Sequence, residues 1–243
     1  MKKIRSPKVP SLQHLARIWA PDSEQIRRTL VRLATNGPTF SYQLIFDFIE
    51  DLLHSKIPYE QIECAVRTRV ARQDVRSNFL ELLPLMRDKV SSMQPSFVHK
   101  VSPRYYPMGR DLMIPFAPPF VYGENGAIHL PWFSFWKTNP MDGQRLSLFS
   151  TIVHQILAQD PDLESAELSI HDFSVDEPGG ARSPKLILAS EIPRLDQGRL
   201  TEMLTVFLNG YRAACTDLAE MQASVKSPDL DRSLDVDQLM LFD

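Results

Sequence analysis

The sequence predicts an α+β protein: an N-terminal helical region, then a mainly antiparallel sheet packed with two helices, then a disordered C-terminal tail. Three observations indicate this class. Apolar residues recur at helical spacing through the first hundred residues, aromatic and β-branched runs broken by prolines begin near Val101, and no apolar period continues after Ser224. We therefore predict a helical region over 1–100, an α+β domain over 101–223 and a tail over 224–243.

The helical region should contain five helices. Apolar residues are spaced for one buried face in the stretches 11–20, 22–36, 42–55, 59–71 and 74–93. Pro84 lies inside the fifth stretch, and because proline removes a helical hydrogen bond, we expect it to kink or split that helix. Cys64 and Cys215 each stand alone on a predicted helix, so we expect two small buried side chains in a reducing compartment.

The α+β domain should follow the order β-β-α-β-β-α. The turn at Glu124–Gly126 predicts a hairpin. A helix is expected over 144–160, two strands over 166–175 and 183–190, and a long closing helix over 199–222. This order is typical of helices packed on a mainly antiparallel sheet. The aromatic-rich stretch 112–136 receives no functional assignment.

Charge is distributed unevenly along the chain. Residues 1–110 hold 18 Lys and Arg against 10 Asp and Glu, and residues 111–243 hold 9 against 20. A basic first half can follow a nucleic-acid backbone, although the two halves can equally attract each other. No run of 18 apolar residues and no signal peptide is found, so we expect a cytoplasmic protein without a membrane partner.

The helices expected over 11–36 have some features of a helix-turn-helix unit. Arg27, Arg28 and Arg32 project from the second of them and are the candidate DNA contacts. The alternative is an ordinary helical hairpin, which we favour because Ala20, Pro21 and Asp22 replace the usual glycine-containing turn.

Motifs for common catalytic chemistry are missing from the sequence. It contains no phosphate-binding glycine loop, no nucleophile elbow and no paired Cys or His spacing for zinc. We therefore expect no cofactor and no metal, and we favour a protein that is not an enzyme.

Residues 110–222 resemble, in the order of their elements, the core of the restriction-endonuclease-like nucleases. That family uses an acid-x-Lys triplet on a strand, with a second acid nearby, to hold Mg²⁺ and position water. Phe135-Trp136-Lys137 would be the triplet here, with Lys137 as the catalytic lysine. Phe135 occupies the place of the essential acid, and only Asp111 or Glu124 is offered by the preceding strands, so the resemblance implies a divergent or inactive relative.

The tail contains the pentapeptide Gln238-Leu239-Met240-Leu241-Phe242. It resembles the Q-L-[S/D]-L-F peptide by which bacterial polymerases and repair proteins hold the β sliding clamp, the β subunit of DNA polymerase III. The resemblance implies that Gln238, Leu239, Leu241 and Phe242 bind the clamp: the Gln amide makes hydrogen bonds and the apolar side chains enter adjoining pockets. The alternative is a tail that folds back and covers an apolar groove on its own protein.

These observations favour a non-catalytic bacterial interaction protein of replication or repair, tethered to the sliding clamp. Two alternatives remain open. One is a clamp-occupying inhibitor of replication, such as the toxin of a toxin-antitoxin pair. The other is a clamp-tethered nuclease of the restriction-endonuclease-like type. Loss of Mg²⁺-dependent cleavage in Lys137→Ala would support the last of these.

Overall fold

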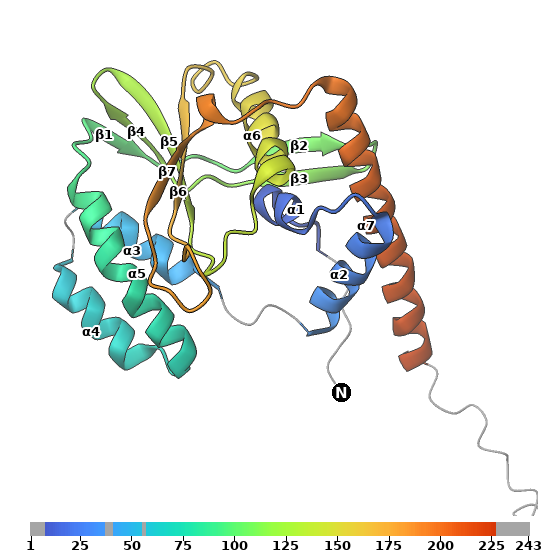
Figure 1. Cartoon of the computed structure of the whole chain (residues 1–243), viewed down its shortest axis with the longest axis horizontal. Coiled ribbons are helices and arrows are strands. Elements are labelled where there is room, and N and C mark those ends of the chain that lie inside the picture. The colour runs from blue at the N-terminus through green and yellow to red at the C-terminus, as the bar shows by residue number, and fades with distance from the viewer. Residues whose placement is uncertain (1–7, 37–40, 55–56, 227–243) are drawn as a thin grey trace, which may run out of the picture. The chain divides into compact units, whose positions relative to one another are not determined.

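The computed structural model of this chain describes residues 8–36, 41–54 and 57–226, and its elements define an α+β fold, as the sequence predicts (Figure 1). The helices of the described residues are α1 (Leu12–Ile18), α2 (Ser23–Asn36), α3 (Gln43–Leu53), α4 (Tyr59–Arg69), α5 (Gln73–Ser91), α6 (Gly143–Leu157), the 3₁₀ turn η1 (Ala189–Glu191) and α7 (Gln197–Lys226). The strands are β1 (Phe97–His99), β2 (Arg104–Met108), β3 (Leu112–Phe116), β4 (Val121–Glu124), β5 (Ala127–Ser134), β6 (Glu167–Asp172) and β7 (Lys185–Leu188). The predicted tail over 224–243 lies outside the described residues from 227 onward.

Contacts divide the chain into two compact units. The larger contains Val9–Trp19 and Pro38–Leu204, and the smaller contains the remainder, including Ala20–Gly37 and the chain from Thr205 onward. These units do not follow the predicted boundaries at residues 100 and 223. The difference arises because α1 packs on α6, inside the larger unit, while α2 packs on the later turns of α7.

The larger unit is built on a five-stranded sheet with the strand order β1-β4-β5-β6-β7. Three of its neighbouring pairs are antiparallel, and β5 pairs with β6 in parallel. A parallel pair requires a crossover, and α6 supplies it. Strands β2 and β3 form a separate antiparallel pair.

The hairpin between β4 and β5 forms at the predicted turn. Asn125 and Gly126 have φ angles of 53° and 80°. Two successive left-handed residues define the tight hairpin turn that asparagine followed by glycine favours, because these residues tolerate positive φ. This local sequence sets the register in which Tyr122 lies opposite His129.

Helices cover both faces of β5. Leu130 and Trp132 point to the face covered by α6, where the rings of Trp132 and Phe149 lie 5.5 Å apart. Phe133 and Phe135 point to the other face and join the apolar cluster of α3, α4 and α5. Figure 1 shows α6 and α5 on opposite sides of these strands. Most of the aromatic-rich stretch therefore belongs to the core, and its side chains point alternately into the apolar layers on the two faces of the sheet.

Of the kink or split expected at Pro84, the split does not occur: α5 runs unbroken from Gln73 to Ser91 and buries Leu83 and Met86 on either side of the proline. The expectation that both cysteines are buried is wrong. Cys64 is exposed and Cys215 is only half-buried, not buried as expected. Cys64 lies between Ile62 and Val66, which use the buried face of α4, so at about 100° per residue Cys64 turns away from it.

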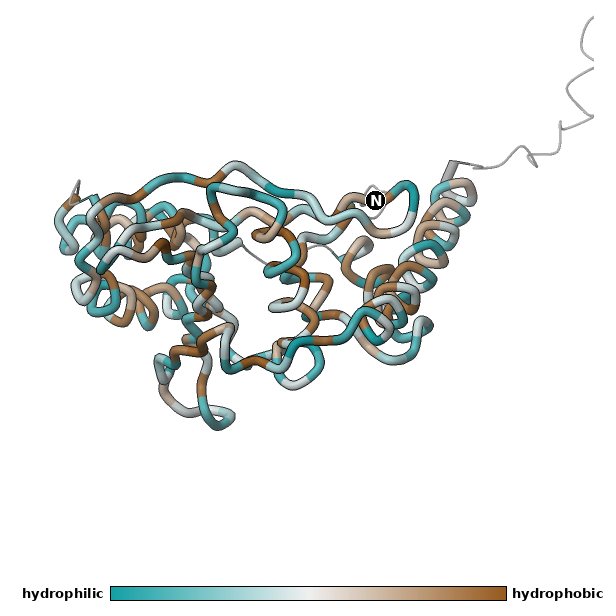
Figure 2. Tube along the Cα trace, turned by 90° about the horizontal axis from the view of Figure 1, so that it is seen from above, coloured by the Kyte–Doolittle hydropathy of each residue, from teal (hydrophilic) through white to brown (hydrophobic). Residues whose placement is uncertain are grey.

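The smaller unit depends on a close approach of α2 to α7. A Cβ atom on Gly210 would lie 2.6 Å from the backbone oxygen of Ser23 and 2.8 Å from Cβ of Ile26. Only glycine permits this distance. Figure 2 shows apolar and polar residues alternating along the helix that leads to the C-terminus, as expected for a helix with one buried side.

We expect Gly210→Ala to destabilise the protein, although alanine is the better helix former. The clash should outweigh the gain in helix propensity of about 1 kcal/mol and leave a net loss of about 2 kcal/mol. Asn209→Ala is the matched control, because Asn209 is exposed on the same helix and should gain about 0.5 kcal/mol. Urea unfolding checks both, and a Gly210→Ala variant as stable as Asn209→Ala would contradict this close approach.

His171 is buried beside the aromatic layer of β5. Its ring stacks on Phe133 at 5.2 Å, and its Nε2 lies 3.2 Å from the Ser169 hydroxyl. Burial, together with the positive charge of Lys89, lowers the pKa of His171 to about 3. The folded protein therefore keeps this ring neutral at pH values where the unfolded chain binds a proton.

We expect the stability that His171 contributes to be fully present above about pH 6.5 and to be lost as the pH falls towards 3. The unfolded state then holds one more proton, so wild type should lose about 1 kcal/mol per pH unit relative to His171→Gln between pH 6 and 4. Urea unfolding at pH 7.5, 6 and 5 measures this difference. His54→Gln, which changes an exposed histidine, should keep the dependence of the free energy of unfolding on pH that wild type shows. An equal dependence on pH in wild type and His171→Gln would refute the prediction.

Candidate functional site

The residues predicted to bind the clamp, Gln238, Leu239, Leu241 and Phe242, lie outside the described residues. The remaining predicted site residues are described, as is one cleft that the sequence did not predict.

Arg27 is held by carboxylates of its own unit. It forms an ion pair with Glu24 at 2.5 Å and another with Asp217 of α7. These contacts raise the pKa of Arg27, and the hydrogen bonds from Arg27 and Arg28 lower the pKa of Glu24 to about 2. Arg27 therefore acts in joining α2 to α7, which leaves it poorly suited to bind a phosphate.

Arg28 and Arg32 are exposed on α2. Arg28 pairs with Glu24 at 2.8 Å, but three quarters of its side chain remains exposed. The helix-turn-helix interpretation also needs α1 and α2 in one unit, and α1 is assigned to the larger unit. The structure therefore gives no support to groove reading by this pair of helices.

Lys137 follows β5 and is exposed. Its backbone oxygen accepts a hydrogen bond from Val175 N at 2.9 Å, and its ammonium group forms no ion pair in the described part of the chain. Phe135, at the place of the essential acid, is buried and stacks on Phe133. Of the acids offered for the nuclease, Asp111 is exposed beside the β2–β3 turn and Glu124 accepts a hydrogen bond from Gln94 N at 2.6 Å.

Metal ligands do not gather within the described residues. No group of three or more His, Cys, Asp and Glu side chains there could hold an ion. The nuclease interpretation thus gains no support from the described part of the chain.

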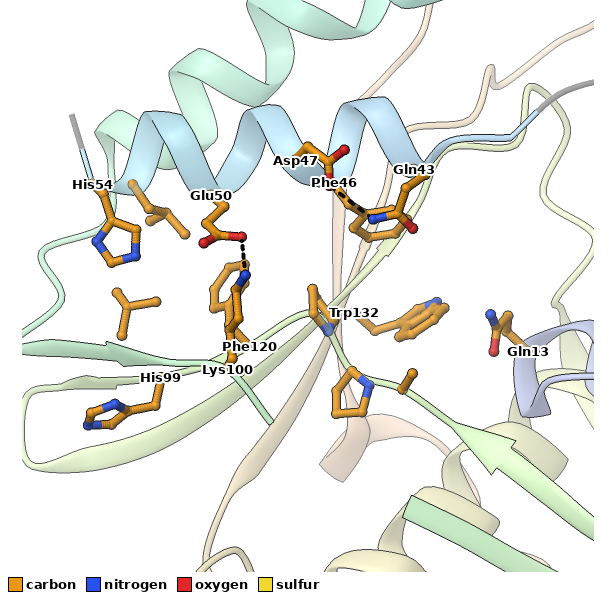
Figure 3. A pocket seen from close by; sticks show the side chains of 15 residues that line it. Gln13, Gln43, Phe46, Asp47, Glu50, His54, His99, Lys100, Phe120 and Trp132 are labelled. Carbon is orange, nitrogen blue, oxygen red and sulfur yellow. Dashed lines mark hydrogen bonds and ion pairs between the residues drawn. The ribbon is translucent and has the colours of Figure 1, made fainter. Parts of the chain in front are cut away.

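A cleft of about 640 Å³ opens beside the start of β4, where β5 continues beyond its pairing with that strand, and we call it the Trp132 cleft (Figure 3). Strand β4 pairs with β5 only as far as His129, whereas β5 runs on to Ser134. The preceding loop, Ala117–Phe120, contains Pro118 and Pro119, which have no backbone N–H to extend the pairing. The sheet therefore leaves a hollow beside the second half of β5, and α3 closes it from one side.

Two residues that line this cleft each bury a polar atom that has no hydrogen-bond partner among the described residues. They are Trp132, which is only 4% exposed and whose indole Nε1 makes no hydrogen bond there, and Gln13 of α1, whose buried Oε1 accepts none. Both residues line the cleft, and Figure 3 shows them at the same end of it. An unsatisfied buried donor or acceptor costs about 1–3 kcal/mol, so such atoms are rare and call for an explanation.

Charged and polar side chains line the rest of the cleft. Glu50 of α3 forms an ion pair at 2.9 Å with Lys100, which follows β1, and Gln43 donates a hydrogen bond to Asp47 at 3.0 Å. His54 and His99 lie at the end away from Trp132 in Figure 3. The two carboxylates, Asp47 and Glu50, outnumber the single lysine, Lys100, so these three side chains give the lining a net negative charge.

Sequence reasoning missed this site. Gln13 and Trp132 lie 119 positions apart, one on an amphipathic helix and one in the aromatic-rich stretch. The pair of prolines at 118 and 119 was the one local sign that pairing would stop at this place.

Comparison with known proteins identifies no relative. No protein-family profile, characterised protein or solved structure matches the chain significantly. Among the described helices, none combines the length and the apolar character needed to cross a membrane.

We expect Arg27→Ala to lower the melting temperature, because Asp217 and Glu24 lose their shared cation. Arg28→Ala is the control: it should change the melting temperature little, since Arg28 is mostly exposed. Thermal unfolding followed by circular dichroism checks the pair of variants. Equal melting temperatures would show that the Arg27–Asp217 contact does not join the two helices.

Proposed function

We propose that this protein is a non-catalytic interaction protein that binds the bacterial β sliding clamp through Gln238, Leu239, Leu241 and Phe242. The observation that carries the proposal is the pentapeptide Gln238–Phe242, which resembles the clamp-binding peptide at four of its five positions. The remaining position, Met240, corresponds to the tolerant place of that motif.

The residue types suit such a contact. A primary amide offers both a donor and an acceptor, so Gln238 can make paired hydrogen bonds with a groove. Leu241 and Phe242 supply the apolar area that drives binding, while a short anchor that must be ordered on binding gains only modest affinity. A dissociation constant in the micromolar range, about −8 kcal/mol, is therefore expected.

The proposal also limits where the folded units lie relative to the clamp. Helix α7 is described as far as Lys226, and residues 227–237 separate it from Gln238. A chain of this length spans at most about 40 Å. Any second contact, such as DNA binding by Arg28 and Arg32, would raise the overall affinity through effective concentration.

Binding of the full chain to a purified bacterial β clamp tests the proposal. Fluorescence anisotropy should give a micromolar dissociation constant, competed by a peptide with the known clamp motif. Gln238→Ala and Phe242→Ala should each weaken binding at least about tenfold, or 1.4 kcal/mol. Met240→Ala, at the tolerant position, should leave it within about threefold; binding that is missing at 100 µM clamp, or insensitive to all three changes, contradicts the proposal.

The same peptide would serve an accessory factor or an inhibitor of replication. Both would compete with polymerases for the groove, but only an inhibitor should stop DNA synthesis when overexpressed. Thymidine incorporation after induction separates them. Rescue by the double variant Leu241→Ala, Phe242→Ala would assign that arrest to the clamp groove, and incorporation that continues unchanged would favour the accessory factor.

A further inference from the structure

We propose that β7 pairs with β7 of a second copy of this chain, in an antiparallel register centred on Ile187, so that the two five-stranded sheets become one continuous sheet. This pairing is independent of clamp binding. It uses the free edge of the sheet in the larger unit.

Strand β7 forms one edge of the five-stranded sheet. It stands last in the order β1-β4-β5-β6-β7, and no other strand of the described residues pairs with its outer side. Its pairing with β6 continues through Val175 and Arg182, whereas β1, at the opposite edge, has only three residues. A very short strand is one way in which proteins protect an edge, and unpaired backbone groups along a longer edge are a template for another chain.

The backbone groups of Leu186 and Leu188 point to the open side of β7. In the same antiparallel ladder, Ser183 N donates to the chain that continues β6, at 3.0 Å, and alternate residues of a strand bond to the same neighbour. Ile187 therefore bonds to β6, and the residue on either side of it faces outward. The contact of Leu188 N with Glu191 Oε2, at 3.4 Å, agrees with this direction.

The side chains of the same two residues are apolar and exposed. Leu186 is 56% exposed and Leu188 is 42% exposed. Because they lie two positions apart in a strand, they point to the same face, where they stand opposite His171 and Ser169 of β6. The outer edge of the sheet thus combines unpaired backbone groups with apolar surface, and both favour association.

One register of self-pairing suits the outward-facing residues of both strands. Centred on Ile187, it sets Leu186 opposite Leu188 of the second copy, and both residues direct their backbone groups across the contact. A register centred on Leu186 would set Leu188 opposite Pro184, which has no N–H to donate. A register centred on Leu188 would set Leu186 opposite Ser190, which lies in η1, beyond the end of the strand.

A second copy supplies both side chains and charges that match. The two-fold arrangement places the leucines of both copies side by side on one face, as a symmetric dimer contact requires. Lys185 pairs with Asp176 of its own chain and would lie opposite Ala189 of the second copy, so no like charges meet across the contact. A parallel arrangement would instead set the two copies of Lys185 side by side.

Sedimentation velocity of the full chain tests the pairing at concentrations from about 1 to 500 µM. We expect a reversible equilibrium between monomer and dimer with a dissociation constant of about 1–100 µM, because the contact adds only a few backbone hydrogen bonds and a small apolar area. A chain that remains monomeric throughout this range overturns the proposal.

Variants at Leu186 connect the dimer to this edge. Leu186→Pro removes an N–H that faces outward and leaves the pairing with β6 in place, and Leu186→Lys puts a charge at the contact. Each should raise the dissociation constant at least about tenfold, or 1.4 kcal/mol. Met113→Lys is the control, since Met113 is 51% exposed on β3 and should leave the dimer unchanged. Dimers of both Leu186 variants that are as tight as wild type overturn the proposal.

Disulfide crosslinking tests the register. The two copies of Ile187 should lie directly opposite each other as a non-hydrogen-bonded pair, with Cα atoms about 4.5 Å apart, so Ile187→Cys should form a disulfide between chains on mild oxidation. Peptide mass spectrometry separates this link from any made by Cys64 or Cys215. Leu186→Cys is the control: its two copies should lie diagonally, about 7–8 Å apart, which exceeds the usual limit of about 6.8 Å. Equal yields from the two variants overturn this register.

Discussion

Burial of the parallel strands β5 and β6 on both faces is the constraint on which the larger unit depends. Parallel pairs occur where helices cover both sides of a sheet, because the crossover itself places a helix on one face and the other face must also be covered. Here α6 covers one side through Trp132 and Phe149, while the cluster of α3, α4 and α5 covers the other through Phe133 and Phe135. Helices α3, α4 and α5 are therefore a layer of the sheet domain and do not form a separate core.

The same strand explains why a cleft exists. β5 is longer than its antiparallel neighbour, and the prolines before β4 prevent the chain there from completing the pairing. The fold thus retains a hollow next to Trp132, whose ring packs in the core and whose N–H has no hydrogen-bond partner among the described residues.

The smaller unit is stabilised in a different way, by a close helix contact and an ion pair. Gly210 lets the backbone of α2 approach α7, and Arg27 joins Asp217 across the same contact. This contact changes the role of Arg27, a basic residue of α2, from a candidate DNA contact to a link between two helices. Arg27, which the sequence offers as a DNA contact, instead pairs with a carboxylate 190 positions away, whereas Arg28 and Arg32 are exposed.

The sequence by itself determined the α+β class, most helices, the hairpin at Asn125-Gly126 and the pentapeptide Gln238–Phe242, because each is encoded by residues within a few positions of one another. Only the tertiary structure decided the continuity of α5 through Pro84, the parallel pairing of β5 with β6, the partner of Arg27 and the meeting of Gln13 with Trp132 at one cleft. These depend on burial and on contacts between distant segments. Helical periodicity and turn residues do not indicate which distant residues come into contact. The free energy of burial decides those contacts, and it depends on the whole assembled core.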